Sequence, residues 1–150
     1  GLGENMMSGI IHVKGNVSQS AGATAHGGTI IINGNASSRC GISLKGANLI
    51  VKGSVGHMSA FMAQSGTLLV CGNAGEALGD SIYETVIYLA GKPKSLGVDC
   101  EEKNITKKDL IKIDELLKIG NIKNIKANKF KKYGSARKLY NFQIDNISDY

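Results

Sequence analysis

The sequence predicts an all-β fold, a single-stranded parallel β-helix with 19-residue turns, followed by a C-terminal helical and irregular tail. Two observations lead to this prediction. Glycines recur every 19 residues without slippage, and each closes a short apolar run such as GTIIING at 28–34. A constant period with a strand-like signature indicates one structural unit that is repeated and stacked. The five closing glycines are Gly15, Gly34, Gly53, Gly72 and Gly91.

Two positions of every repeat are aliphatic. With Gly9 and its equivalents counted as position 0, positions +2 and +4 read Ile11/Val13, Ile30/Ile32, Leu49/Val51, Leu68/Val70 and Ile87/Leu89. Such alternation is typical of a strand with one buried face. Like residues then lie over like, about 4.8 Å apart, in ladders that fill the interior. The six-residue beat of hexapeptide acyltransferases does not fit, because 19 is not a multiple of six.

Small residues mark two corners in each repeat. The first four closing glycines are followed by Asn or Ser, a pairing that suits turns with positive φ. A second set lies 12 residues before each closing glycine: Gly3, Gly22, Gly41, Ala60 and Gly79. The segments after it, such as 42–44 and 61–63, alternate enough to predict a second short strand. Each turn is therefore expected to hold two or three short strands separated by tight glycine corners.

The chain divides into a repeat region at 1–100 and a basic tail at 101–150. Seventeen of the 20 glycines precede residue 92, where four basic and four acidic side chains balance, so the net charge of +6 comes from the remainder. In the tail, Thr106 resembles an N-cap with Asp109 three positions on. A helix is predicted over 107–119, with Gly120 as its C′ residue, packed on one end or flank of the rod. Residues 121–150 are expected to have little regular structure.

The remaining composition excludes several protein classes. Cys40, Cys71 and Cys100 form no CxxC pair and leave an odd thiol, which favours reduced cysteines over disulfides or a zinc site. No apolar run approaches the roughly 18 residues of a membrane span, and no export leader is recognisable. We therefore expect a cytoplasmic protein. Because the chain starts at Gly1, the sequence leaves open whether the native polypeptide extends further.

The candidate reactive groups favour structural roles. Metal ligands must converge, but the histidines fall at three different repeat positions: His12, His26 and His57. Cys71 has only Lys52 and Ala90 above and below it, so no base would activate the thiol. The glycine-rich stretch 72–79 lacks the GK[ST] ending of a phosphate-binding loop. We therefore assign no catalytic, cofactor-binding or metal-ligating residue, and expect the closing glycines to shape corners.

Acidic residues gather in the last full turn of the repeat region. Three of its four acids lie there: Glu76, Asp80 and Glu84. Asp80 stands where the three preceding repeats carry Ala23, Ile42 and Phe61, and an unpaired buried carboxylate is costly. We predict a tail clamp in which Asp80 receives the guanidinium of Arg137. The alternatives are a turn acid that bonds backbone N–H groups, or a groove at these acids that binds a small ligand.

The basic tail has two interpretations. Its aromatic residues, Phe130, Tyr133, Tyr140 and Phe142, lie among lysines as in some nucleic-acid-binding proteins. However, the lysines alternate with isoleucines and asparagines and form no dense block. A solvated face, or a docking surface for an acidic partner subunit, is therefore favoured over nucleic-acid binding.

The repeat G-x-[IL]-x-[IV]-x-G-N, with GTLLVCGNAGEALGDSIYE at 66–84 and KSLGVDCEE at 94–102, resembles the GXGXG domain that ends the large subunit of glutamate synthase. The segment FKKYGSARKLYNF at 130–142 resembles stand-alone versions of that domain, the small third subunits of archaeal-type glutamate synthase and N-methylglutamate-synthase-like complexes. The same repeat is also found in one of the subunits of formylmethanofuran dehydrogenase. The resemblance spans nearly the whole chain.

This resemblance implies a right-handed parallel β-helix that is itself non-catalytic. In such complexes, the partners would be a glutamine amidotransferase and a synthase with FMN and an iron–sulfur cluster, and this chain would bind no cofactor itself. The expected function is a scaffold in glutamate biosynthesis and ammonia assimilation. The alternatives are a formylmethanofuran dehydrogenase component or a free-standing β-helix protein that binds a small ligand. The oligomeric state stays open.

Overall fold

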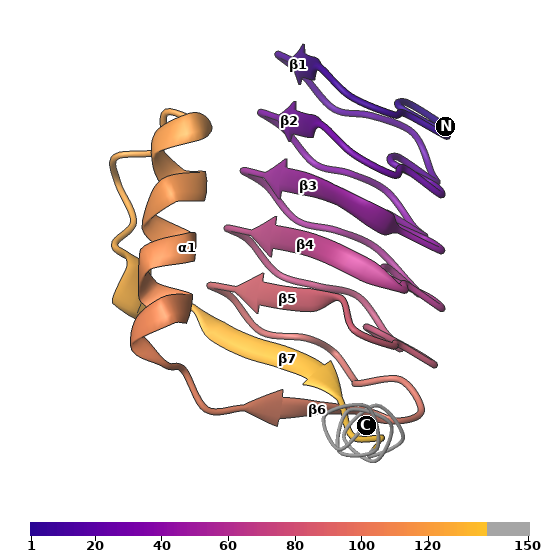
Figure 1. Ribbon diagram of the computed structural model, residues 1–150, viewed down its shortest axis with the longest axis vertical. Coiled ribbons are helices and arrows are strands. Elements are labelled where there is room, and N and C mark those ends of the chain that lie inside the picture. Colours follow the sequence, from indigo (N-terminus) through magenta and orange to yellow (C-terminus); the bar gives the residue numbers. More distant parts are fainter. Residues whose placement is uncertain (138–150) are drawn as a thin grey trace, which may run out of the picture.

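The computed structural model describes residues 1–137, and it confirms the fold class, because the chain coils into a parallel β-helix (Figure 1). Five strands stack in chain order, and each of the first four pairs in parallel with the strand 19 residues further on, as Ile30 does with Leu49. Their bounds are Ile10–Val13 (β1), Thr29–Ile32 (β2), Lys45–Val51 (β3), Ser65–Val70 (β4) and Val86–Leu89 (β5).

The interior is filled by the predicted aliphatic ladders. At positions +2 and +4, the side chains of β2 to β5 are fully buried in one hydrophobic cluster. Ile11 and Val13 of β1 are only half-buried, because no coil lies on their outer side. Stacked aliphatic ladders of this kind stabilise the fold by burying apolar area, coil by coil.

A second hydrophobic cluster lies outside the coil. Position +3 forms an outward ladder, Ile31, Ile50, Leu69 and Tyr88, which is buried beneath the helix α1 (Lys107–Ile119). The alternating pattern predicted one buried face, but these central strands are buried on both. In Figure 1, α1 runs along the stack of strands, so it covers a flank of the rod.

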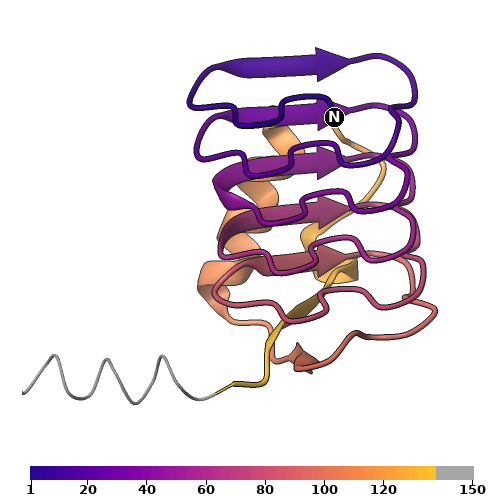
Figure 2. The same cartoon turned by 90° about the vertical axis from the view of Figure 1, so that its right-hand side faces the viewer.

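The rest of each coil is made of bridges and tight turns. Single-residue parallel bridges link Val17, Ala36, Val55, Ala74 and Pro93 in sequence. The predicted second strand is wrong: residues 39, 41 and 43, like their equivalents in other coils, alternate into the left-handed region with φ of 56°, 74° and 52°. The N–H groups of these alternate residues point in turn to the coil on either side. Gly41 donates to Ala21 of the coil before, and Ser43 to Phe61 of the coil after. Figure 2 shows these segments as stepped traces.

The helix α1 has the bounds predicted from the sequence. Thr106 caps it through the Asp109 N–H, and the Asp109 carboxylate accepts from the Thr106 N–H, which completes a capping box. The prediction for Gly120 was wrong: it is the C-cap, with a right-handed φ of −79°, and Asn121 takes the left-handed conformation with φ of 55°.

The tail is more regular than its sequence suggested. After α1, the chain forms a 3-10 helix, η1 (Ala127–Lys129), and a strand, β7 (Lys131–Ser135). β7 pairs antiparallel with β5 on one side and with β6 (Cys100–Lys103) on the other. The strand order is therefore β1-β2-β3-β4-β5-β7-β6. β7 therefore covers the edge of β5, the strand of the last coil, whereas α1 covers the flank of the rod. Tyr140 and Phe142 lie outside the described residues.

Candidate functional site

The closing glycines are required by space, not by backbone conformation. None of the five has a positive φ, so the expectation of left-handed Gly–Asn turns was wrong. A Cβ at Gly34, Gly53, Gly72 or Gly91 would lie 2.9 Å or less from the backbone of the closing glycine one coil earlier. At Gly15, in the first coil, a Cβ would meet nothing within 4 Å. Glycine thus allows the backbones of successive coils to stack in close contact at this corner.

The residue after each closing glycine builds a ladder of hydrogen bonds between coils. The Asn16 Oδ1 accepts from the Asn35 N–H at 2.7 Å, and the Asn35 Oδ1 accepts from the Ser54 N–H at 2.8 Å. The Ser54 Oγ then accepts from the Asn73 N–H, and the Asn73 Oδ1 from the Lys92 N–H, both at 2.9 Å. Each side chain therefore satisfies a backbone donor that the parallel bridges leave unpaired.

A buried ionic cluster fastens α1 to the rod. The Tyr88 hydroxyl, at the end of the +3 ladder, donates to the Asp109 Oδ1 at 2.5 Å. Lys132 of β7 reaches the Asp109 Oδ2 at 3.0 Å. Burial raises the pKa of Asp109, but the hydrogen bonds from Tyr88, Thr106 and Lys132 outweigh it and lower the pKa to about 2. Burial and the bond to the carboxylate raise the pKa of Tyr88.

The sequence offered one signal for this cluster. Among the four buried residues of the +3 ladder, only Tyr88 carries a polar side-chain atom, and Asp109 is the acidic residue noted three positions after the expected N-cap, Thr106. The same carboxylate therefore caps the helix and receives the Tyr88 hydroxyl. α1, β5 and β7 meet at this one group.

The predicted tail clamp has a different acid. Arg137 donates from its Nε to the Asp99 Oδ2 at 3.2 Å, and its guanidinium lies 4.6 Å from the centre of the Tyr83 ring. Asp80 instead accepts from the Ser81 hydroxyl and from the Val98 N–H. These bonds to neighbouring groups satisfy the Asp80 carboxylate, which corresponds to the turn-acid alternative.

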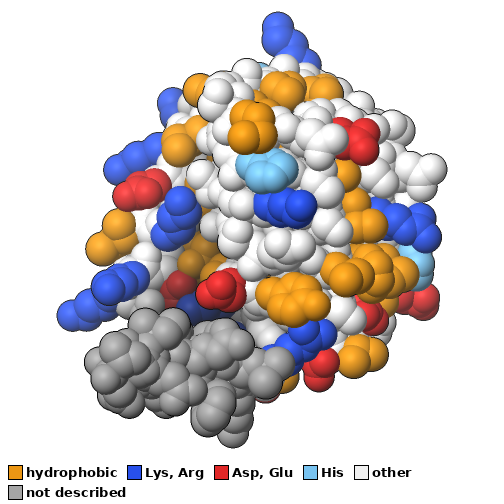
Figure 3. Space-filling view, turned by 45° about the vertical axis from the view of Figure 1, so that its right-hand side comes forward, with side chains coloured by type: hydrophobic (Ala, Val, Ile, Leu, Met, Phe, Trp, Pro, Cys, Tyr) orange, Lys and Arg blue, Asp and Glu red, His pale blue; other side chains and the backbone are white. Residues whose placement is uncertain are grey.

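The acids of the last full turn do not form one groove. Glu76 lines a shallow depression of about 490 Å³ beside His57 and Lys94. Glu84 lines a separate depression of about 320 Å³, between the last coil and β7. Figure 3 shows the surface over the turn segments, where apolar side chains are scattered among charged and neutral ones. The three carboxylates therefore do not converge on a common ligand.

The histidines and cysteines lie in unreactive settings. His12, His26 and His57 are exposed, and residues 1–137 contain no group of three or more His, Cys, Asp or Glu side chains placed to hold a metal ion. Burial raises the pKa of Cys71 to about 11, although Lys52 opposes the rise. The thiol of Cys40, which is fully buried, has its pKa raised to about 12. Thiols with such pKa values are poor nucleophiles at neutral pH.

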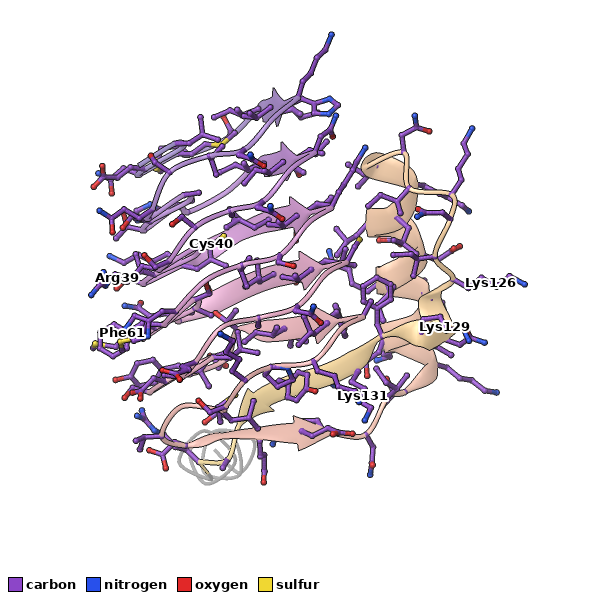
Figure 4. The ribbon with its side chains drawn as sticks, turned by 180° about the vertical axis from the view of Figure 1, so that it is seen from behind. Arg39, Cys40, Phe61, Lys126, Lys129 and Lys131 are labelled. Atoms are coloured by element: carbon purple, nitrogen blue, oxygen red, sulfur yellow. The ribbon has the colours of Figure 1, made fainter. Side chains whose placement is uncertain are left out.

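A basic groove follows the closing corner of the last coil. Two adjoining depressions, of about 380 and 560 Å³, share Ala90 and Lys129 in their linings. We call their combined surface the basic groove; its lysines are Lys92, Lys126, Lys129 and Lys131. Figure 4 shows the last three spaced along the segment that leads into β7. All four side chains are exposed.

The described aromatic residues of the tail are buried, so their rings could not stack on nucleic-acid bases at this surface. Phe130 is 3 % exposed and packs under α1, and Tyr133 is 4 % exposed and completes the interior cluster. The sequence interleaves these residues with lysines, but the fold points them inward.

No helix among the described residues is long and apolar enough to cross a membrane.

Comparison with known proteins gives a family and one curated relative. The family model described as GXGXG motif matches residues 3–145. Protein GlxC of Rhizobium meliloti (strain 1021) is similar to part of the chain, with 55 % identity over 74 residues. That alignment covers 49 % of this chain and 32 % of GlxC, so the chain spans about a third of that relative. No solved structure matches significantly. Since the family model covers almost the whole sequence, the chain belongs to the GXGXG motif family.

Proposed function

We propose that this chain is a non-catalytic scaffolding subunit or domain of a glutamate-synthase-like oxidoreductase complex. In this role, it holds a glutamine amidotransferase and an FMN-dependent synthase in a fixed relation. FMN and an iron–sulfur cluster belong to the partners, and the setting is cytoplasmic ammonia assimilation. Membership of the GXGXG motif family and the resemblance of the repeat and the 130–142 segment to glutamate-synthase domains support the proposal.

The main support for a scaffolding role is that the interior of the coil is completely filled with side chains. Aliphatic ladders occupy the space between the strand side and the turn side of β2 to β5, with side chains of 0 % exposure. The described depressions are shallow and lie on the surface of the rod, and the thiols of Cys40 and Cys71 have raised pKa values. A stack of near-identical coils, locked by a ladder of side-chain hydrogen bonds, presents a stiff surface to partners.

Reconstitution of the complex tests this proposal. The chain would be co-expressed with an amidotransferase and an FMN-containing glutamate synthase encoded beside it. We expect all three to elute together in size-exclusion chromatography. Without the chain, glutamine-dependent glutamate formation should fall, while ammonia-dependent formation persists, because only the coupling of the two reactions needs a scaffold.

Two results would contradict the proposal. One is co-elution with a molybdenum or tungsten enzyme instead, which would favour the formylmethanofuran dehydrogenase alternative. The other is catalysis or small-ligand binding by the isolated chain, which would favour a free-standing binding protein.

A further inference from the structure

The lysines of the basic groove have few counter-charges. Within residues 1–137, none of the ion pairs involves Lys92, Lys126 or Lys129. Lys131 makes a long contact of 3.9 Å to Glu102, and both side chains are more than half exposed. An exposed pair of this kind contributes little stability. The groove therefore holds four lysines against one lining carboxylate, Glu102, and keeps a net positive charge within the described part of the chain.

The groove also has an apolar floor. Ala90, Pro93 and Leu96 line the depression beside Lys92 and Lys131, and Ile125 lines the adjoining one. Leu96 is 36 % exposed and is among the large apolar side chains that remain open to solvent. An apolar floor with a charged rim matches the arrangement of protein–protein interfaces, in which an apolar centre is surrounded by polar groups.

The dimensions favour a polypeptide over a small anion. The two depressions adjoin in an open trough, and its lysines come from three places: the corner after β5, the η1 segment and β7. Each lysine is solvent-exposed, so no lysine forms the enclosed cradle that a single phosphate or carboxylate needs. An extended chain with several carboxylates can reach all of them at once.

The buried aromatic residues favour an acidic protein over a nucleic acid. Single-stranded nucleic acid binds through aromatic stacking as well as charge. In the described tail, Phe130 is 3 % and Tyr133 is 4 % exposed, so neither ring presents a face on which a base could stack, although Tyr133 lines one of the depressions.

We propose that the basic groove is the docking surface for an acidic segment of a partner subunit. Carboxylates of that segment meet Lys92, Lys126 and Lys129, and an apolar side chain packs on Leu96. The proposal rests on the proposed function for the existence of the partner, and it adds the surface and the chemistry of contact. Charge at such a surface speeds association and makes binding salt-dependent.

A matched pair of variants tests the groove. The groove variant is K92E/K126E/K129E, and the control is K14E/K45E/K107E, which reverses three exposed lysines outside the groove with the same change in net charge. The probe is a fluorescein-labelled peptide of alternating Glu and Ala with a central Leu. Fluorescence anisotropy should show binding to the wild-type chain, a loss of about tenfold or more in the groove variant, and a change under about twofold in the control.

Two outcomes would overturn the groove proposal. One is an equal loss of peptide binding in both variants, because that would show a general effect of charge. The other is tighter, groove-dependent binding of an oligothymidylate of matched length, which would identify a nucleic-acid surface. Circular dichroism melting of both variants checks that each is folded.

Co-elution separates this proposal from the proposed function. If the groove variant still assembles with the amidotransferase and synthase subunits as the wild type does, the groove proposal fails and the scaffold remains. If the wild type binds the peptide through the groove but assembles with neither subunit, the proposed function fails and the groove remains.

Discussion

The two corners of each coil use glycine for different physical reasons. At the closing corner, the backbone is ordinary, but a side chain at Gly53 would strike the coil before it. At the second corner, Gly41 has a φ of 74°, yet a Cβ there would meet Leu49 only at an ordinary 3.6 Å. At Gly3, Gly22 and Gly79 a Cβ would come within 2.4 to 2.7 Å of a side-chain atom, which can shift more easily than backbone. The obstacle at the closing corner is thus the backbone of the neighbouring coil, whereas the second corner chiefly penalises the conformation of an L-residue.

Substitution within the repeats agrees with this difference. The closing position is glycine in all five repeats, whereas the second corner accommodates Ala60 with a φ of 60°. A left-handed alanine costs a limited amount of strain, but an overlap with backbone atoms requires the coils to separate. Both corner positions recur every 19 residues, so the sequence shows that each needs a small residue. It does not show whether space or backbone conformation is the cause.

The largest expected effect is at the closing corner. We expect Gly53→Ala to lower the free energy of unfolding by roughly 3 kcal/mol, because the methyl group meets the Gly34 carbonyl and displaces the Asn35 side chain. Urea denaturation followed by circular dichroism measures the change. Gly15→Ala is the matched control and should cost under about 0.5 kcal/mol, since its Cβ meets nothing. Equal costs at the two positions would refute the spatial argument.

Unlike the two glycine corners, the contact between α1 and the rod depends on a charged group, the Asp109 carboxylate. The pKa of Asp109 is about 2 in the folded state, below its ordinary 3.8. The carboxylate therefore stabilises the fold fully above about pH 5, by about 2 kcal/mol, and this contribution is lost as the pH falls towards 2.

Asp109→Asn tests this pH dependence. We expect the variant to be less stable than the wild type at pH 7, with the difference reduced by about half at pH 3. The cost of Gly53→Ala should be the same at both pH values, because the closing corner contains amides and hydroxyls only. A constant difference between Asp109→Asn and wild type from pH 7 to pH 3 would contradict the low pKa.

The second corner should show a smaller cost. Gly41→Ala is expected to lower the free energy of unfolding by about 1 kcal/mol through left-handed strain alone. The reverse change one coil later, Ala60→Gly, should be nearly neutral, because relief of strain offsets the loss of a buried methyl group and the added chain entropy. Thermal melting of the two variants side by side makes the comparison. A cost for Gly41→Ala that matches Gly53→Ala would remove the distinction between the corners.

The hydrogen-bond ladder is expected to give the smallest effect. Asn35→Ala leaves the Ser54 N–H without its acceptor, at a cost of only about 0.5 kcal/mol, because water reaches this exposed position and can replace the lost bond. Asn35→Ser should recover most of the stability, since Ser54 performs the same task one coil later. Hydrogen exchange at the Ser54 amide is the direct measurement. Unchanged protection in Asn35→Ala would show that the ladder is incidental.

The sequence predicted what the repeat itself determines. The fold class, the ladders at +2 and +4 and the bounds of α1 follow from periodicity and from the capping box, which are local signals. The burial of the +3 ladder was missed because it depends on α1, which lies far from Ile31 and Ile50 in the sequence. β7 was missed because KKYGS has no strand pattern, and it forms by pairing with the edges of β5 and β6.

The candidate sites were predicted less well, for a related reason. Arg137 was expected to pair with Asp80, and it pairs with Asp99, 19 residues further on. In a repeating fold, equivalent positions offer similar partners, so sequence alone does not choose the coil that a returning tail reaches. The Asp109 cluster joins three elements that are distant in the chain, and only their packing brings them together.

The length of the helix α1 sets how many coils of the rod the helix covers. Its 13 residues span about 20 Å, and the four ladder residues it buries span about 14 Å along the stack. The first coil lies past its reach, and the ladder position there is the exposed His12. A duplicated repeat inserted between β3 and β4 would therefore leave one more aliphatic side chain facing water, unless the helix grew by about three residues to match. Lengthening the rod and lengthening the helix are changes that evolution would have to make together.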